Sequence, residues 1–518
     1  MMDGAPIEER ARHRRRGRLP GRRRPAPASL DRGVAGGGRY RPLSEDDCRA
    51  VHATTLELLS TLGLSQPIPS MVEHVVAKGG RLTPDGRLLF PKALVEDVIA
   101  GARRDIVLHG RRPGLEIEPV GDRVYVGSGG AAPSIVDLET GRYRPATARD
   151  LYDAARLVDT LDNIHLFSRS LVARDARDPY QLDVNTAYAC LAGTAKHVCV
   201  SASDPNNVRA IAEVCVTVAG DWARFVEAPF LTIMVCHVVP PMRFAEEACG
   251  TIEQAVRLGF PIQIISAGQA GATSPATIAG SLVQAVAETL AGLTFAWLVD
   301  PRARAIFAPK PLVADLRTGA MCGGGGEQAV LMAAAAQMGR YYDLPTSSIA
   351  GITDAKVPDA QHGYEKCLAV SQAAHAGANI ITQACGMQAS LLGASLEGYV
   401  VDNDMLGAIL RTVRGVEAGA DTLSAEVIAE VSRGEGHYLG HPQTLARMER
   451  DYVYPSVADR CTPAAWEESG GEGMRARARR RAREVLAEHF PRHIDDACDA
   501  MLRNVHDILI PPEAMRAG

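Results

Sequence analysis

The densest run of side chains that could do chemistry covers residues 351–366, Gly-Ile-Thr-Asp-Ala-Lys-Val-Pro-Asp-Ala-Gln-His-Gly-Tyr-Glu-Lys. Its candidates for catalytic acid, base or charge-partner roles are Asp354, Lys356 and Glu365, and its candidates for substrate contact are Gln361 and Tyr364. In a helix that begins after Pro358, positions 361 and 365 are four apart and share one face. The alternative is a solvated helix start that Asp359 caps. The run therefore predicts either a substrate-facing loop or a capped helix.

Two histidines, His437 and His441, lie four residues apart in Gly-Glu-Gly-His-Tyr-Leu-Gly-His, residues 434–441. On a helix both imidazoles would lie on one side, but the surrounding glycines argue against a regular helix. A zinc site needs at least one further ligand, and the sequence offers none at a recognisable spacing. We therefore expect no metal in this chain, and we interpret both histidines as substrate-binding groups in a loop over the active site.

A glycine-rich loop, Cys-Gly-Gly-Gly-Gly-Glu, spans residues 322–327 and leads into a helical run. Backbone N–H groups at such a helix start can bind an anion, although the Gly-Lys-Ser/Thr of a P-loop is missing. Close approach to a neighbouring chain is the alternative. We take Gly323, Gly324 and Glu327 as candidates for cofactor contact. No Gly-x-Ser-x-Gly elbow or Ser-His-Asp order indicates hydrolysis.

The elements that must position these groups are short β-rich runs alternating with helical runs, which is typical of parallel βαβ units. The eight runs that we predict to be strands are 124–127, 164–168, 197–201, 230–236, 261–266, 303–308, 347–352 and 378–382. Eight such units favour an α/β fold of the (β/α)8 TIM barrel type. A doubly wound open sheet is the competing architecture, but no Gly-x-Gly-x-x-Gly follows the first strand.

In such a barrel the active site lies at the carboxyl ends of the strands. The polar residues predicted there are Arg169, Asp204, His237, Gln269, Lys310, Asp354 with Lys356, and Gln383. No single one is diagnostic, because a polar residue at a strand end is as often a loop cap.

Flanking the barrel core, residues 123–400, we expect an N-terminal helical layer over 43–122 and a C-terminal helical region over 401–518. In the first, Ser44 has the position of an N-cap before acidic residues, and helical spacing covers 51–64, 68–77 and 91–102. In the second, 474–489 and 493–509 have helical spacing. Residues 134–144 predict a β-hairpin on the first βα loop.

Residues 1–42 form a basic segment with nine arginines between Arg10 and Arg24. Like charges repel and little apolar surface is available, so we expect a disordered tail, with contact to nucleic acid or an acidic partner as the alternative. The whole chain has a net charge of −5, which gives no general signal for nucleic acid or membrane.

The 11 cysteines include no Cys-x-x-Cys pair, and their wide spacing favours free thiols in a reducing cytoplasm. No stretch of roughly 18 apolar residues predicts a membrane span.

Several motifs, in order along residues 43–510, resemble the trimethylamine–corrinoid methyltransferase superfamily. They are Gly129-Gly-Ala-Ala-Pro with Asp137-Leu-Glu-Thr-Gly, Ala270-Gly-Ala-Thr-Ser-Pro, Ala287-Glu-Thr-Leu-Ala-Gly, Gln337-Met-Gly-Arg-Tyr-Tyr-Asp-Leu-Pro, Thr353-Asp-Ala-Lys, Val401-Asp-Asn-Asp, and the loop of His437 and His441. The resemblance implies a barrel that moves a methyl group from an amine to the cobalt of cobalamin carried by a separate corrinoid-binding protein. Archaeal trimethylamine members carry pyrrolysine, whereas this chain has standard residues only. It resembles instead the glycine betaine methyltransferase branch.

A quaternary amine suits that branch, because its leaving group is a neutral amine that needs no general acid. Aromatic faces and a carboxylate can hold the cation. The candidates are Tyr125, Phe167, Tyr364 and Asp354, while Arg169, Lys356 or His437 could meet a substrate carboxylate. Two other functions stay open: a quaternary-amine binding or regulatory barrel without catalysis, and a barrel lyase or decarboxylase of the uroporphyrinogen decarboxylase shape. A homo-oligomer is compatible with all three.

Overall fold

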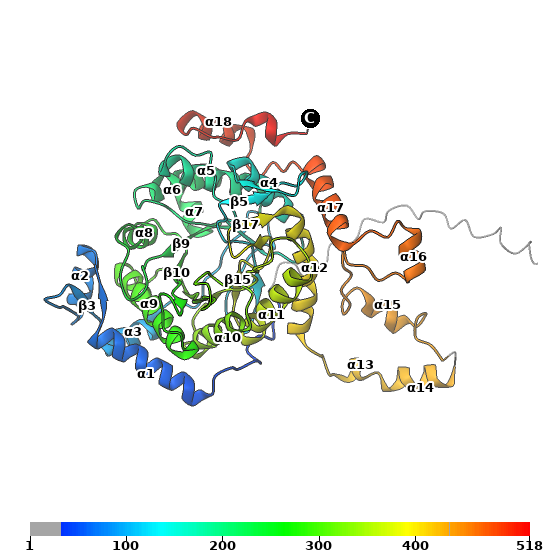
Figure 1. The fold of residues 1–518 in the computed structure, drawn as a ribbon, viewed down its shortest axis with the longest axis horizontal. Helices are drawn as coiled ribbons and strands as arrows, with labels where there is room; N and C mark the ends of the chain where they lie inside the picture. The colour runs from blue at the N-terminus through cyan, green and yellow to red at the C-terminus, as the bar shows by residue number, and fades with distance from the viewer. Residues whose placement is uncertain (1–32, 435, 518) are drawn as a thin grey trace, which may run out of the picture.

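A closed barrel of eight parallel strands forms the centre of the molecule in the computed structural model, which describes residues 33–434 and 436–517 (Figure 1). The strands are β4 (Tyr125–Val126), β7 (Leu166–Ser168), β8 (His197–Val200), β9 (Leu231–Cys236), β10 (Ile262–Ser266), β12 (Ala305–Pro309), β14 (Ser347–Ile349) and β15 (Ile380–Thr382). They pair in the orders β12-β10-β9-β8-β7 and β14-β15-β4. Parallel bridges from Gly127 to Leu166 and from Phe307 to Thr346 join the two sets. The predicted barrel is confirmed, and an open sheet is excluded.

Alternation along the strands separates an inner face from an outer one. Tyr125, Leu166, Cys199, Ile306 and Ile380 meet inside the barrel. Ile106, Leu108 and Ile117, from the segment before β4, join this inner cluster and close the end where the strands begin. The intervening residues face outward and pack against the helices.

One helix follows each barrel strand and covers the outside (Figure 1). These helices are α4 (Ala148–Asp159), α5 (Pro179–Gly193), α6 (Asn207–Ala219), α8 (Glu246–Arg257), α9 (Ile278–Val299), α10 (Gly326–Tyr341), α11 (Ala360–Ala376) and α12 (Leu396–Arg414). The short α7 (Trp222–Glu227) lies between α6 and β9.

The helix α9 corrects the expectation that no segment is long and apolar enough to span a membrane. It passes that test by length and composition, and 83% of its most apolar window is buried in the fold. It contacts α1, α2, α3, α8 and α10 together with β10 and β12. Its apolar sides therefore serve the core of the barrel domain.

Three N-terminal helices pack beside α9: α1 (Glu45–Thr61), α2 (Pro69–Val76) and α3 (Lys92–Gly101). A small sheet joins them, in the order β1 (Leu64–Ser65), β3 (Arg87–Leu89), β2 (Arg81–Leu82). As predicted, Ser44 caps α1, accepting the Asp47 N–H at 3.1 Å while Asp47 accepts the Ser44 N–H at 2.9 Å.

Part of the segment that the sequence assigns to the disordered tail packs on the barrel: Val34 pairs with Val124, and the Gly37 N–H donates to the Asp122 carbonyl. Glycines at 36–38 allow this close approach; a Cβ on Gly37 would lie 2.9 Å from the Gly377 backbone. The predicted disorder of the arginine-rich stretch falls on residues 1–32, which lie outside the described part.

The predicted hairpin is confirmed as β5 (Ser134–Val136) and β6 (Tyr143–Pro145). It forms a sheet with β17 (Gly393–Ser395) and β16 (Met387–Gln388), from the segment that follows β15. A second small sheet, β11 (Gln269–Ala270) with β13 (Leu312–Val313), extends β10 and β12 beyond their carboxyl ends.

Beyond α12 the chain leaves the barrel as an arm, which we define as residues 416–456 and which projects to one side in Figure 1. It contains α13 (Ala420–Leu423), α14 (Ala425–Arg433) and α15 (Pro442–Met448), and α16 (Pro463–Glu468) follows it. The chain returns with α17 (Met474–Glu488), which packs on α12 and α4, and with α18 (Asp496–Val505), which packs on α6; η1 (Pro512–Met515) ends it.

Candidate active site

Asp354, in the loop between β14 and α11, connects three loops at the carboxyl ends of the strands. Its Oδ1 accepts the Gly323 N–H at 2.8 Å and the Ser390 hydroxyl at 2.6 Å. Its Oδ2 accepts the Cys322 thiol at 3.2 Å and the Gly324 N–H at 3.4 Å. The glycine loop thus binds a carboxylate of the same protein through its backbone N–H groups, and its contact with a cofactor stays a prediction.

Glu365, on the first turns of α11, holds the same loop from the other side. Its Oε2 accepts the Thr353 hydroxyl at 2.5 Å and the Asp354 N–H at 2.8 Å, and its Oε1 accepts the Gln361 amide at 2.8 Å. A Cβ on Gly324 would lie 2.1 Å from the Glu365 carboxyl carbon. A side chain at position 324 would therefore displace this carboxylate from its present position.

We call Asp354 and Glu365, together with the groups that donate to them, the clamp. Beside the clamp, Lys356 and Tyr364 lie at the surface. The Lys356 ammonium donates to the Asp354 carbonyl at 2.6 Å. The Tyr364 side chain is 62% exposed, with its hydroxyl 3.4 Å from Glu365 Oε1. Asp354 and Glu365 thus lie against the glycine loop, and Lys356, Gln361 and Tyr364 contact one or the other of these two residues. The roles of these five side chains in catalysis or substrate binding stay predictions.

The backbone at 389–391 is strained where it approaches the clamp. Ala389, Ser390 and Leu391 all have positive φ, at 52°, 54° and 72°. Hydrogen bonds from Ala389 N–H to the Ala355 carbonyl and from Ser390 N–H to the Thr353 carbonyl hold this conformation. Such strain persists only where the surroundings impose it, and it is common at functional sites.

The electrostatics of the clamp favour an ionised Asp354. Burial alone would raise the pKa of Asp354, but the hydrogen bonds from Ser390, Gly323, Cys322 and Gly324 hold it below its usual value. Burial and the neighbouring carboxylate raise the pKa of Cys322 to about 11, so its thiol stays protonated and donates.

Two of the predicted aromatic contacts lie elsewhere. Tyr125 is the first residue of β4 and is buried at the closed end of the barrel, where its ring packs edge to face against His165 and its hydroxyl accepts the Glu118 N–H. Phe167 alternates with the inward-facing Leu166 and Ser168, so it points outward into the helix layer. Neither side chain lies at the mouth of the barrel, by which we mean the end where the strands have their carboxyl ends.

Arg169 follows β7, and its backbone N–H donates to Cys199. Burial lowers the pKa of its guanidinium, and Asp183 on α5 opposes that shift. Its Nε is buried without a hydrogen-bond partner in the described residues.

The remaining predicted residues are dispersed. Glu327 is exposed in the first turn of α10. His437 and His441 lie in the arm, where the His441 ring accepts the Gln443 N–H at 3.1 Å and lies 3.7 Å from Glu430. These contacts hold the turn before α15. Among residues 33–434 and 436–517, no three His, Cys, Asp or Glu side chains are grouped as metal ligands.

Lys310 is a cation inside the barrel mouth, and the sequence alone did not distinguish it from the other polar residues at strand ends. Lys310, directly after β12, is 2% exposed, and its ammonium donates to the Thr382 hydroxyl at 2.9 Å and to Gln263 Oε1 at 3.2 Å. The signal that could have identified it is alternation, since 306, 308 and 310 share the inward face of that strand.

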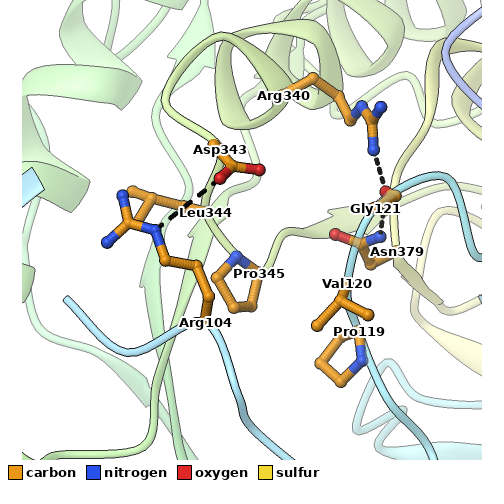
Figure 2. A pocket seen from close by; sticks show the side chains of 9 residues that line it. All are labelled: Arg104, Pro119, Val120, Gly121, Arg340, Asp343, Leu344, Pro345 and Asn379. Carbon is orange, nitrogen blue, oxygen red and sulfur yellow. Dashed lines mark hydrogen bonds and ion pairs between the residues drawn. The ribbon is translucent and has the colours of Figure 1, made fainter. Parts of the chain in front are cut away.

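The pocket in Figure 2 lies at the opposite end of the barrel. This cavity of about 180 Å³ is lined by residues 119–121, Leu344, Pro345 and Asn379, which precede β4, β14 and β15. The Asn379 amide donates to the Gly121 carbonyl at 3.0 Å, and Arg340 donates to the same oxygen (Figure 2). Since barrel enzymes act at the carboxyl ends of their strands, the mouth is the candidate active site.

The chain is similar to known proteins over nearly its whole length. Residues 10–507 match the family model described as trimethylamine methyltransferase (MTTB). The glycine betaine methyltransferase of Desulfitobacterium hafniense strain Y51 is 27% identical, over 90% of this chain and 96% of that protein. The trimethylamine methyltransferase MttB of D. hafniense strain DCB-2 is 29% identical, over 89% and 92%.

Among solved structures, the monomethylamine methyltransferase of Methanosarcina barkeri has a similar fold. Its TM-score is 0.51 at 14% sequence identity, covering 87% of this chain and 90% of that one. At this identity the likeness concerns the fold alone.

Proposed function

The chain belongs to the trimethylamine methyltransferase family, and from that premise we propose that it transfers a methyl group from an amine to the cobalt of a separate corrinoid protein. The observation that carries the proposal is the family match over nearly the whole chain, together with a barrel whose mouth is built from the matched motifs. Glycine betaine and trimethylamine are named for relatives at similar identity, so they do not by themselves select the amine.

A quaternary amine fits standard side chains best. The N–CH3 bond breaks with its electron pair remaining on nitrogen, the methyl group bonds to cobalt, and a neutral tertiary amine leaves without a proton. In its reduced Co(I) state the corrinoid supplies the electron pair of the new bond. The protein must then hold the cation in line with the cobalt and exclude water.

In this proposal the clamp around Asp354 positions the rim of the mouth. Asp354 and Glu365 act on loop geometry, because their oxygens are occupied by protein donors. Tyr364 and Lys356 are exposed beside them and can contact the amine or the corrinoid protein.

The test is a methyl-transfer assay with purified protein, cob(I)alamin and separate amines: glycine betaine, choline, tetramethylammonium and trimethylamine. We expect the absorbance of methylated corrinoid with at least one quaternary amine. Binding of a quaternary amine without transfer, to free cob(I)alamin or to a corrinoid protein, would instead indicate a non-catalytic binding barrel. Release of CO2 from a carboxylated amine would indicate a decarboxylase.

For the arm we propose self-association with a second copy of this chain. Its described residues include one buried residue, Val431, while many large apolar side chains are exposed. They are Val416, Leu423, Ile428, Tyr438, Leu439, Leu445, Met448 and Tyr452. At roughly 150–200 Å² for a whole side chain, they present on the order of 800 Å², which is one side of a standard protein interface.

A permanent partner explains this surface better than the corrinoid protein does, because obligate interfaces are more apolar than transient ones. The corrinoid protein must leave after each turnover, and it must reach the mouth, whereas the arm projects to the side (Figure 1). We place the protein in the cytoplasm, where its cysteines, none of them in a disulfide among the described residues, stay reduced.

A further inference from the structure

Three lysines are buried in the described part of the chain, and their partners differ. Lys196 donates to the carbonyls of Val158, Leu161 and Ile164 at 2.6–2.7 Å, which uses all three of its protons. Lys366 forms an ion pair with Asp402 at 2.6 Å. Both ammonium groups are therefore fully compensated by the fold.

The charge of Lys310 is compensated neither by three backbone carbonyls nor by an ion pair. Its two hydrogen bonds, to Gln263 Oε1 and the Thr382 hydroxyl, use neutral oxygens and leave one proton free. Among the described residues, its hydrogen-bond acceptors are neutral and no carboxylate forms an ion pair with it. A buried cation without a counter-charge is costly, and a fold retains it where an anion binds.

The groups around Lys310 are neutral as well. The thiols of Cys199 and Cys236 lie close enough to interact with its charge, but burial raises the pKa of both, that of Cys199 to about 12. Burial lowers the pKa of Lys310 itself to about 8, so the ammonium is largely charged at neutral pH.

Solvent reaches this part of the barrel. Met234 on β9 and Ile265 on β10 are partly exposed. Met234 pairs in register with Gln263, whose amide oxygen accepts from Lys310. Solvent that enters the mouth therefore reaches the layer of the barrel that contains Gln263, the hydrogen-bond partner of Lys310.

We propose that Lys310 binds the carboxylate of the amine substrate and thereby selects amines that carry both a methylated nitrogen and a carboxylate. This inference rests on the proposed methyl transfer. The carboxylate lies inward, on Lys310, and the methylated nitrogen points outward to the mouth, where a corrinoid can approach. Trimethylamine and choline offer no anion to this site and leave the cation uncompensated.

The experiment compares wild type with Lys310→Met, using glycine betaine and choline, which share the trimethylammonium group and differ in the carboxylate. The ratio of kcat/KM for glycine betaine to that for choline should fall at least tenfold in the variant, because the charge partner of the carboxylate is gone. An equal loss for both substrates would overturn the inference.

The pH profile supplies a second readout. Carboxylate binding needs the protonated ammonium, so kcat/KM for glycine betaine should fall as pH rises above about 8, and Lys310→Met should lose this limb. A wild-type profile that is the same for choline and glycine betaine would contradict the role of Lys310.

Lys196→Met is the matched control, because Lys196 is equally buried but binds backbone carbonyls at the closed end of the barrel. It should lower the melting temperature and leave the substrate ratio unchanged. Lys310→Met should melt at the wild-type temperature or above it, since it removes an uncompensated buried charge. A large drop would mark Lys310 as structural.

Calorimetry separates this inference from the proposed function. Glycine betaine should bind wild type at least tenfold more tightly than it binds Lys310→Met, whether or not a methyl group is transferred. If no methyl group is transferred but glycine betaine still binds more tightly to wild type than to Lys310→Met, only the proposed function is rejected. Equal affinities of the two proteins for glycine betaine would reject the inference. If the variant does not fold, the affinity of wild type is measured against pH instead: a loss of affinity above about pH 8 supports the inference, and a constant affinity rejects it.

Discussion

At the scale of single residues, the clamp at Asp354 makes a position-specific prediction. Its carboxylate accepts four protein donors from two loops, so Asp354→Ala releases the glycine loop and Ser390 together. We expect methyl transfer to fall about tenfold or more, since truncating a hydrogen-bonded charge costs a few kcal/mol. The measurement is kcat/KM with the preferred amine.

Asp359→Ala is the control for this substitution. Asp359 lies five residues further on and caps α11 through the His362 N–H at 3.2 Å, without contacting the glycine loop. It should cost about 1 kcal/mol of stability as a lost cap and little rate. Equal rate losses in the two variants would show that the clamp has no special role.

The same carboxylate has a signed pH effect on stability. Because the pKa of Asp354 is held below that of the unfolded chain, its contribution is present above about pH 4 and is lost as pH falls further. Near neutral pH, the Asp354→Ala variant should therefore have a lower melting temperature than wild type. The difference between the two melting temperatures should shrink on acidification below about pH 4. A difference that grows there would refute the ionised clamp.

At the scale of elements, the glycine loop before α10 is set by close packing. A Cβ on Gly323 would lie 2.1 Å from Ile352 Cγ2, whereas a Cβ on Gly326 would meet nothing within 4 Å. Gly323→Ala should destabilise the protein by about 1–3 kcal/mol through overpacking. Gly326→Ala, at the start of the same helix, should be neutral or slightly stabilising. Thermal unfolding of the pair checks this, and equal midpoints would contradict it.

At the scale of the whole molecule, the arm predicts the state of association. A variant with Leu439→Glu and Leu445→Glu places two charges in the proposed interface and should convert an oligomer into monomers, measured by light scattering after gel filtration. Val505→Glu, on α18, is the control because Val505 is similarly exposed outside the arm. A wild-type monomer, or an oligomer that survives the double substitution, would reject self-association through the arm.

The sequence by itself determined the order and type of the barrel's elements. Runs of apolar residues with strand or helix spacing located all eight strands, the helix caps at Ser44 and Asp359, and the hairpin before Pro145, because these signals are local to a few turns or pairs. It also placed Asp354, Gln361, Tyr364 and Glu365 in one neighbourhood, since they lie within about three turns of each other in the chain.

Only the tertiary structure decided which side chains face the mouth. In barrel strands of two to six residues, a shift of one position turns every side chain to the other face. Closure of the barrel selects the phase, that is, which alternate residues of each strand point inward. That phase buried Tyr125 at the closed end, turned Phe167 outward and pointed Lys310 inward. The four donors to Asp354 lie 30 to 36 positions away in the chain. The absence of a counter-charge beside Lys310 is a property of the packed interior, so no local pattern in the sequence carries either feature.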